Sequence, residues 1–515
     1  MQTIFEAFRL IADPQVILTV VLASFFGLFV GAVPGLTATM ATALLVPMTF
    51  FMDPLSSVAA IVACTAMAIT AGDIPGCLLR IPGTPASAAY TDETYMMTKK
   101  GLGAQALGSS LVSSVIGGLF GAIVLIFAAP SLARVALNFS SFEYFWLAAI
   151  GLTCAALVSS SGYLPGIISL FIGLAISTVG MDVISGSPRF TFGVVDLMGG
   201  VSFVPAMIGM FALSEIFHSL VYGTARHRFA KPQKVSGIFS GIMPLMAKYR
   251  TNIGRGSIIG TLIGILPGAG GDIAAWITYA TARRFSKEPE KFGTGHPEGV
   301  IEAGAANNAG LSGAWVPALV FGVPGDAVTA IAVGVLYMKG LNPGPRLFET
   351  QGAMLYAVFM IFLIANLALL PLGWLAIRAA SRILVVPRPQ LMALILLSCV
   401  VGSFAINNAV FDIIVMVAFG LIAFALSEAR IPIAPIILGV VLGPMLEQNF
   451  LTSMTIANGN LLAFFERPIA AVLGASAILF WSMPLLGLAL RTSRRARPPS
   501  AALDQPQEMG RTTSL

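Results

Sequence analysis

The stretch Gly264-Ile-Leu-Pro-Gly-Ala-Gly-Gly-Asp272 lies in the middle of a long apolar run, residues 256–282. Pro267 lacks a backbone donor and the glycines around it lower helix propensity, so a continuous membrane helix is not expected there. Unpaired backbone groups are costly in lipid, and such a break is tolerated only where protein buries it or a polar cavity meets it. The stretch therefore predicts a broken helix beside a polar cavity.

The same break occurs near the N-terminus, in Gly31-Ala-Val-Pro-Gly-Leu-Thr37, where a shift of 233 residues places Pro34 on Pro267. A second pair of segments, 73–83 and 315–325, aligns with a shift of 242 residues. Proline and glycine are common in membrane helices, but their recurrence in the same order favours an internal repeat. Broken apolar segments at corresponding places in two halves indicate the binding site of a secondary transporter.

The composition is that of a polytopic membrane protein. Of 515 residues, 57% are hydrophobic and 10% are charged, whereas about a quarter of the residues of a soluble domain are charged. The net charge of +6 comes from basic loops between apolar runs, which is typical of membrane proteins and does not indicate nucleic-acid binding. The four cysteines lie singly in apolar segments, so neither a disulfide framework nor a metal site is predicted.

Apolar runs near 20 residues predict the membrane-spanning helices. We expect an all-α polytopic membrane protein with about 11 spanning helices and two re-entrant hairpins, arranged as two inverted repeats of Pro-Gly-broken helices. The hairpins are the broken runs 15–52 and 255–282. The expected spans are 55–79, 104–129, 143–160, 164–181, 199–222, 300–320, 352–376, 391–406, 408–427, 431–446 and 468–490.

Basic loops predict the orientation. Positive residues concentrate in 224–255 and in the tail from residue 491, so both are expected in the cytoplasm. The second hairpin has basic flanks and is expected to enter from the cytoplasm, and the first from the opposite face. Two tilted crossings are the alternative for each hairpin. The predicted parts are a first membrane repeat (1–223), a basic cytoplasmic connector (224–255), a second membrane repeat (256–490) and a disordered cytoplasmic tail (491–515).

Polar residues beside the breaks are the candidate ligands, because backbone freed from helix pairing offers N–H and C=O groups there. A carboxylate inside a membrane segment costs about 2.5–3.5 kcal/mol or more and so predicts function. Capping of a half-helix N-terminus is the structural alternative. The predicted ion-binding residues are Asp73, Asp272 and Asp326. The predicted substrate-binding residues are Gly35, Thr37, Thr39, Thr84, Ser87, Gly268, Gly270, Asn307 and Asn308.

The sequence gives less support to a catalytic function. The sequence has no GxxxxGK[ST] phosphate loop, so the chain is not expected to hydrolyse nucleotide itself. His296 and Glu298 are half of a metal site at most, since they lie in a charged, Gly- and Pro-rich loop without a third ligand nearby. We therefore expect a protein that is not an enzyme and has no cofactor.

In and around the Pro-Gly breaks, the sequence resembles the large membrane subunit (TctA-type permease) of the tripartite tricarboxylate transporters. The resemblance covers nearly the whole chain. Its most specific motifs are Gly31-Ala-Val-Pro-Gly-Leu-Thr37, Gly72-Asp-Ile-Pro-Gly76, Ile81-Pro-Gly-Thr-Pro-Ala-Ser87, Gly264-Ile-Leu-Pro-Gly-Ala-Gly-Gly271 and Glu302-Ala-Gly-Ala-Ala-Asn-Asn308.

The resemblance implies uptake of small carboxylates, such as citrate, across a bacterial inner membrane by symport with a sodium ion or proton. It also implies two protein partners, a small membrane subunit and a periplasmic solute-binding protein that delivers the substrate, beside the membrane lipid. The residues themselves leave three alternatives open, which are a channel, an ATPase-coupled permease and an intramembrane enzyme.

Overall fold

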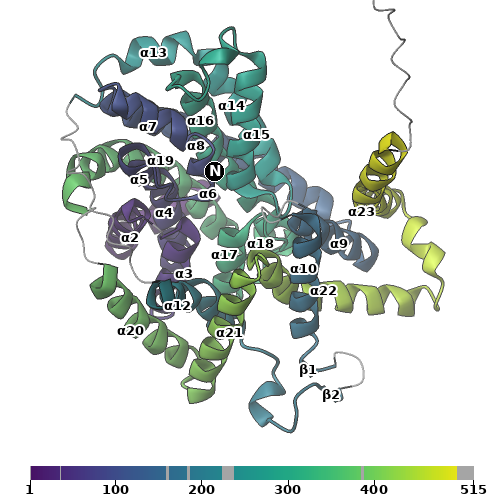
Figure 1. Cartoon of the computed structure of the whole chain (residues 1–515). Helices are drawn as coiled ribbons and strands as arrows, with labels where there is room; N and C mark the ends of the chain where they lie inside the picture. The colour runs from purple at the N-terminus through teal and green to yellow at the C-terminus, as the bar shows by residue number, and fades with distance from the viewer. Residues whose placement is uncertain are drawn as a thin grey trace, which may run out of the picture.

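The computed structural model of the chain consists almost entirely of helices (Figure 1). It describes residues 2–34, 36–157, 162–182, 186–222, 237–383 and 388–495. An all-α polytopic membrane fold is therefore confirmed, because seven of the described helices are long and apolar enough to cross a membrane. They are Pro14–Ala32, Pro54–Leu79, Gly103–Ala136, Phe203–Tyr222, Gly352–Ala380, Val410–Glu428 and Ala434–Ile456.

Helices occupy all of the expected spans. In chain order they are α4 (Pro54–Ala71) with α5 (Asp73–Leu79), α8 (Gly103–Ala136), α9 (Ser141–Leu157), α10 (Tyr163–Ser177), α11 (Phe203–Ile208) with the π-helix η2 (Gly209–Leu213) and α12 (Ser214–Tyr222), α16 (Pro297–Phe321), α19 (Gly352–Ile383), α20 (Arg388–Asn407), α21 (Val410–Glu428), α22 (Ala434–Ile456) and α23 (Pro468–Arg495).

The remaining elements are the arms of the two broken runs, one of which is the candidate span Pro14–Ala32, and short connecting elements. They are α1 (Gln2–Ile11), α2 (Pro14–Ala32), α3 (Ala38–Thr49), α6 (Pro85–Ala88), α7 (Thr91–Lys99), η1 (Val195–Leu197), α13 (Ile242–Lys248), α14 (Arg250–Ile265), α15 (Gly270–Phe285), η3 (Pro289–Lys291), α17 (Ala327–Met338), α18 (Pro345–Thr350) and η4 (Leu461–Phe465). The strands β1 (Gly180–Met181) and β2 (Pro188–Arg189) pair antiparallel, with Gly180 opposite Arg189, in the loop after α10.

Several helix ends differ by a few residues from the expected ones, and two of them bear on the predicted parts. α22 continues ten residues beyond the expected end at 446, because Glu447, Gln448 and Asn449 are polar without being helix breakers. α23 continues to Arg495, so the first five residues of the expected tail, 491–495, are helical. The rest of that tail and residues 223–236 of the expected connector lie outside the described residues.

The second broken run forms a helical hairpin on α16. Residues 256–264 of α14 pack along residues 302–310 of α16, so the two helices run parallel. After the break, α15 returns in the opposite direction, and its Tyr279 packs against Gly299 near the start of α16. The tip of the hairpin therefore lies halfway along α16, and both of its arms lie on the N-terminal half of that helix (Figure 1).

The first broken run repeats this arrangement with α2, α3 and α4. α2 packs in parallel against α4, and α3 returns antiparallel, with Thr42 bonded to Thr65 at 3.1 Å. At each backbone contact a glycine is required, because a Cβ there would lie 2.2–2.5 Å from a carbonyl oxygen of the neighbouring helix. The corresponding contacts are Gly27–Cys64 with Gly260–Ala306, and Gly31–Ala68 with Gly264–Gly310.

The corresponding helices α4 and α16 point in opposite directions. α5, which continues α4, lies antiparallel to α8, because residues 73–77 contact residues 103–110 in reverse order. α8 lies parallel to α16, since residues 117–121 pack along residues 305–309. α16 is central, and its residues from Glu298 to Val320 are buried.

A buried carboxylate joins the two halves at the open end of the second hairpin. Glu93 of α7 accepts hydrogen bonds from the backbone N–H groups of Gly295 at 2.7 Å and His296 at 2.8 Å. The backbone of Gly293 and the hydroxyl of Tyr279, the latter at 2.9 Å, donate to the same carboxylate. Four donors around one charge fix the loop before α16 against α7.

Candidate functional site

A cavity of about 420 Å³ lies where the two hairpin tips meet. We call it the hairpin cavity. Its opposite wall comes from α12 and from the turn between α21 and α22. Six of the residues predicted from sequence line it: Thr37, Thr39, Thr84, Asp272, Asn307 and Asp326.

Two helices begin at the wall of this cavity, each capped by a predicted residue. Thr37 caps α3, and its Oγ1 accepts the N–H of Met40 at 3.2 Å. Asp326 caps α17, and its Oδ1 accepts the N–H of Thr329 at 2.8 Å. Both helices have 12 residues, and their aligned peptide dipoles place partial positive charge at the cavity. The start of α3, whose cap is neutral, therefore presents amide donors to an anion, whereas the Asp326 carboxylate already accepts the donors of α17.

The turn that begins α17 has a counterpart in the first half. Thr84 and Ser87 form a reciprocal capping box at the start of α6, as Asp326 and Thr329 do at α17. The shift between the two boxes is the 242 residues of the sequence alignment. Ser87 is buried within its box and does not line the cavity.

The neighbouring asparagines face different ways. Asn307 lines the cavity, and its buried Nδ2 makes no hydrogen bond within the part of the chain that the structure describes, although the Tyr90 hydroxyl is close enough to interact with it. Asn308 points into the protein, where its Oδ1 accepts from Thr70 at 3.1 Å and its Nδ2 donates to Asn366 at 3.4 Å. A buried donor without a partner is unusual, so Asn307 is the clearest ligand-binding candidate in the cavity.

Asp272 caps a helix of the other half instead of its own. It lies in the first turn of α15, but its Oδ1 accepts the N–H of Ala86 in α6 at 3.1 Å. Gly270 has φ +58°, and a Cβ there would lie 2.6 Å from the Cβ of Asp326. This glycine brings Asp326 close to the turn that carries Asp272, and the two carboxylates interact electrostatically.

The two carboxylates offer hard oxygen ligands for a small cation, together with the carbonyl groups of the unwound backbone. The part of the chain that the structure describes contains no group of three His, Cys, Asp or Glu side chains arranged to hold a metal ion. Cation binding in the hairpin cavity would therefore combine carboxylate oxygens with hydroxyl or backbone oxygens.

The other predicted residues lie elsewhere. Asp73 accepts hydrogen bonds from Tyr90 at 2.8 Å and from Ser110, and it does not line the hairpin cavity. It was expected at a break, but Gly72 is helical and the α4–α5 span is continuous. Gly268, at φ +80°, packs against the backbone of α9. Gly35 lies outside the described residues.

Three charged or titratable residues of the opposite wall were not predicted. Glu215 and His218 belong to α12, and Arg430 belongs to the turn after α21. Glu215 could have been predicted from the sequence, because it is a carboxylate within an expected span. Arg430 could not, since a basic residue in a short loop is ordinary in a membrane protein.

Residues 17–438 match the family model described as the tripartite tricarboxylate transporter TctA family. The chain belongs to this family. One relative of this TctA-family chain is 33% identical over 450 residues, which cover 87% of this chain and 88% of the relative. It is named "Uncharacterized 52.8 kDa protein in TAR-I ttuC' 3'region" of Agrobacterium vitis.

A second relative of this TctA-family chain has the printed name "Uncharacterized protein in TAR-II ttuC' 3'region", also from Agrobacterium vitis. It is 34% identical over 214 residues, which cover 42% of this chain and 88% of the relative. No solved structure matches the chain.

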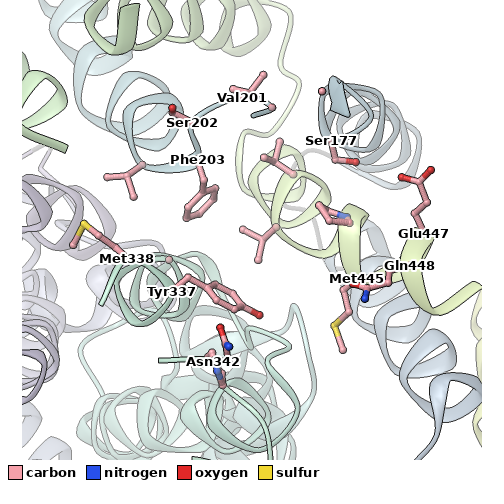
Figure 2. Close-up of a pocket in the computed structure, with 18 of the residues that line it drawn as sticks. Ser177, Val201, Ser202, Phe203, Tyr337, Met338, Asn342, Met445, Glu447 and Gln448 are labelled. Carbon is pink, nitrogen blue, oxygen red and sulfur yellow. The ribbon is translucent and has the colours of Figure 1, made fainter. Parts of the chain in front are cut away.

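The TctA-family fold also contains a larger cavity, of about 1330 Å³. Figure 2 shows Phe203 and Tyr337 on one side of this space and Ser177, Met445 and Glu447 on the other. Its rim is fixed by Arg189 of β2, whose guanidinium donates two hydrogen bonds to Glu447 of α22, at 2.6 and 3.1 Å. None of the predicted site residues that the structure describes lines this second cavity.

Proposed function

We propose that this chain is the large permease subunit of an ion-gradient-driven secondary transporter for small carboxylates of the tricarboxylate or dicarboxylate type. One observation carries the proposal, which is that corresponding breaks from both halves meet at the hairpin cavity. The start of α3 and the Nδ2 of Asn307 suit a carboxylate. Asp272 and Asp326 suit a sodium ion or proton taken up with it.

The relation between the two cavities supports a carrier over a channel. α17 lines the hairpin cavity at Val328 and the second cavity at Gly334, and α22 lines them at Ala434 and Val440. Six helical residues span about 9 Å. Buried apolar side chains of the described residues occupy this layer. They include Met207, Ile208, Ile331, Val333, Ile436, Ile437 and Leu438.

The directions of the helices support inverted repeats. The corresponding helices α4 and α16 are antiparallel, as two halves inserted in opposite orientations require. The basic connector follows α12, which lines the hairpin cavity near His218. By the positive-inside rule we place this cavity, and the C-terminus, on the cytoplasmic side of a bacterial inner membrane. The second cavity would then open to the periplasm.

The proposed assembly has three proteins, in keeping with the tripartite family. A periplasmic binding protein would deliver the carboxylate to the second cavity, and a small membrane subunit would complete the permease. The chain has no extended polar stretch that could form a soluble domain to collect dilute substrate. We therefore expect this subunit alone to transport slowly.

Uptake by proteoliposomes containing all three proteins tests the proposal. Radiolabelled citrate and succinate are supplied outside, and sodium and proton gradients are imposed separately. We expect saturable uptake driven by one of the gradients without nucleotide. Uptake that needs ATP indicates an ATPase-coupled permease, uptake that does not saturate indicates a channel, and a chemically altered substrate in mass spectrometry indicates an enzyme.

A further inference from the structure

The charges around the hairpin cavity are unevenly distributed. Asp272 and Asp326 lie on the hairpin wall, and Glu215 lies on the opposite wall. Arg430 is the one Lys or Arg among the described residues that line the cavity. Among the described residues, a substrate with several negative charges therefore meets one permanently cationic side chain at this cavity.

The backbone holds Arg430 in a conformation that an arginine rarely adopts. Its φ is +58°, in the left-handed region that favours glycine. The turn is closed by hydrogen bonds from the N–H of Arg430 to Ser427 at 2.9 Å and from the N–H of Ile431 to Leu426 at 2.8 Å. Glycine would make this turn at lower cost, so the backbone does not explain the arginine.

No protein partner explains it either. Within the described part of the chain, the guanidinium of Arg430 makes no hydrogen bond or ion pair, and the side chain is exposed at the cavity wall. Arg80 provides a comparison, because it also ends a helix at φ +60°. Its guanidinium, however, binds Asp92 at 2.8 Å. Arg430 is thus a left-handed arginine whose guanidinium remains available to a ligand.

We propose that Arg430 binds a second carboxylate of the substrate, so that the hairpin cavity selects dicarboxylates and tricarboxylates over monocarboxylates. This inference rests on the proposed function. One carboxylate would accept hydrogen bonds from Asn307 and from the start of α3 on the hairpin wall. The other would reach Arg430, whose planar guanidinium matches a carboxylate with two parallel hydrogen bonds. A monocarboxylate has no group left for that contact.

Equilibrium binding to the purified full chain in lipid nanodiscs tests this selectivity. The ligands are citrate, succinate and propionate, titrated over a range that reaches weak, millimolar dissociation constants. The variants are Arg430→Gln, Arg430→Lys and, as a matched control, Arg80→Gln. We expect Arg430→Gln to weaken citrate and succinate binding at least tenfold and to change propionate binding less than twofold. Arg430→Lys should restore part of the loss, and Arg80→Gln should change nothing.

Two results overturn the inference. Unchanged citrate and succinate binding in Arg430→Gln would show that the guanidinium does not touch substrate. An equal loss for all three ligands would show that Arg430 attracts any anion and does not select by the number of carboxylates. Failure of the proposed function looks different, because the unmodified chain would then bind none of the three ligands.

Discussion

Asp272 in one half of the chain accepts a hydrogen bond from the backbone N–H of Ala86 in the other half, at 3.1 Å. The carboxylate is thus both a structural contact between the halves and a charge at the hairpin cavity. The two roles are separable, because an amide oxygen can still accept the N–H of Ala86 after the charge is removed.

Replacing Asp272 by Asn is expected to abolish the dependence of uptake on the ion gradient. The variant should still fold and insert, because the contact with Ala86 survives. The measurement is uptake by proteoliposomes with and without an imposed gradient. Asp73→Asn is the matched control, since Asp73 is buried but away from the cavity, and it should keep its ion dependence. If a well-folded Asp272→Asn protein keeps the same dependence on the ion gradient, Asp272 serves only as the structural contact to Ala86.

Replacing Gly264 by Ala is expected to lower stability by about 1–3 kcal/mol, the usual cost of overpacking. The new Cβ would lie 2.3 Å from the carbonyl oxygen of Gly310. That oxygen belongs to the backbone of α16, so the clash can be relieved only by moving a helix. Gly254 is the control in the same helix, because it has open space around it. Gly254→Ala should be neutral or stabilising by about 0.5–1 kcal/mol. Thermal unfolding in detergent compares the two, and equal midpoints would contradict the close packing.

A cysteine in the apolar layer is expected to react with thiol reagents only while transport proceeds. Ile437 is 1% exposed, whereas Tyr337 at the second cavity is 47% exposed. An impermeant methanethiosulfonate should therefore label Tyr337→Cys at rest and Ile437→Cys only in the presence of substrate and gradient. The four native cysteines are buried and should add little background. Rapid labelling of Ile437→Cys at rest would indicate an open pore.

Replacing Glu93 by Gln is expected to destabilise the protein by about 2–4 kcal/mol. The amide keeps one acceptor oxygen, so some of the four donors around the buried carboxylate lose their partner. Asp92→Asn is the adjacent control, because its ion pair with Arg80 is exposed and should contribute little. The measurement is the thermal unfolding midpoint of each variant, compared with that of the unmodified protein. Similar midpoints for the two would mean that the Glu93 network does not hold the halves together.

Sequence patterns predicted the breaks because their causes are local. A proline and several glycines in an apolar run act within one helical turn, and they interrupt the chain at Pro34 and at Pro267 as expected. Pro75 and Pro317 lie within the expected spans 55–79 and 300–320 and do not break them. Pro75 lies in the first turn of α5, where its missing N–H does little harm, and Pro317 is accommodated within α16.

The opposite wall of the cavity could not be predicted in this way. Arg430 lies more than 100 residues after Asp326 in the sequence, and only the packing of α12 and the α21–α22 turn brings it to the hairpin tips. Single-sequence periodicity carries no information on such pairings. Such patterns identify the residues of a break but not the distant residues that tertiary packing brings close to the break.

Where Gly31 meets Ala68 and Gly264 meets Gly310, no side chain separates the two helices. An interface of this kind has no rotamers to rearrange, so we expect each hairpin arm and its crossing helix to move as a single solid piece. The layer where α17 meets α11 and α22 is different, because it is built of Ile, Val, Leu and Met side chains. We therefore expect relative motion to take place along that layer, with the hairpins moving past it as rigid bodies.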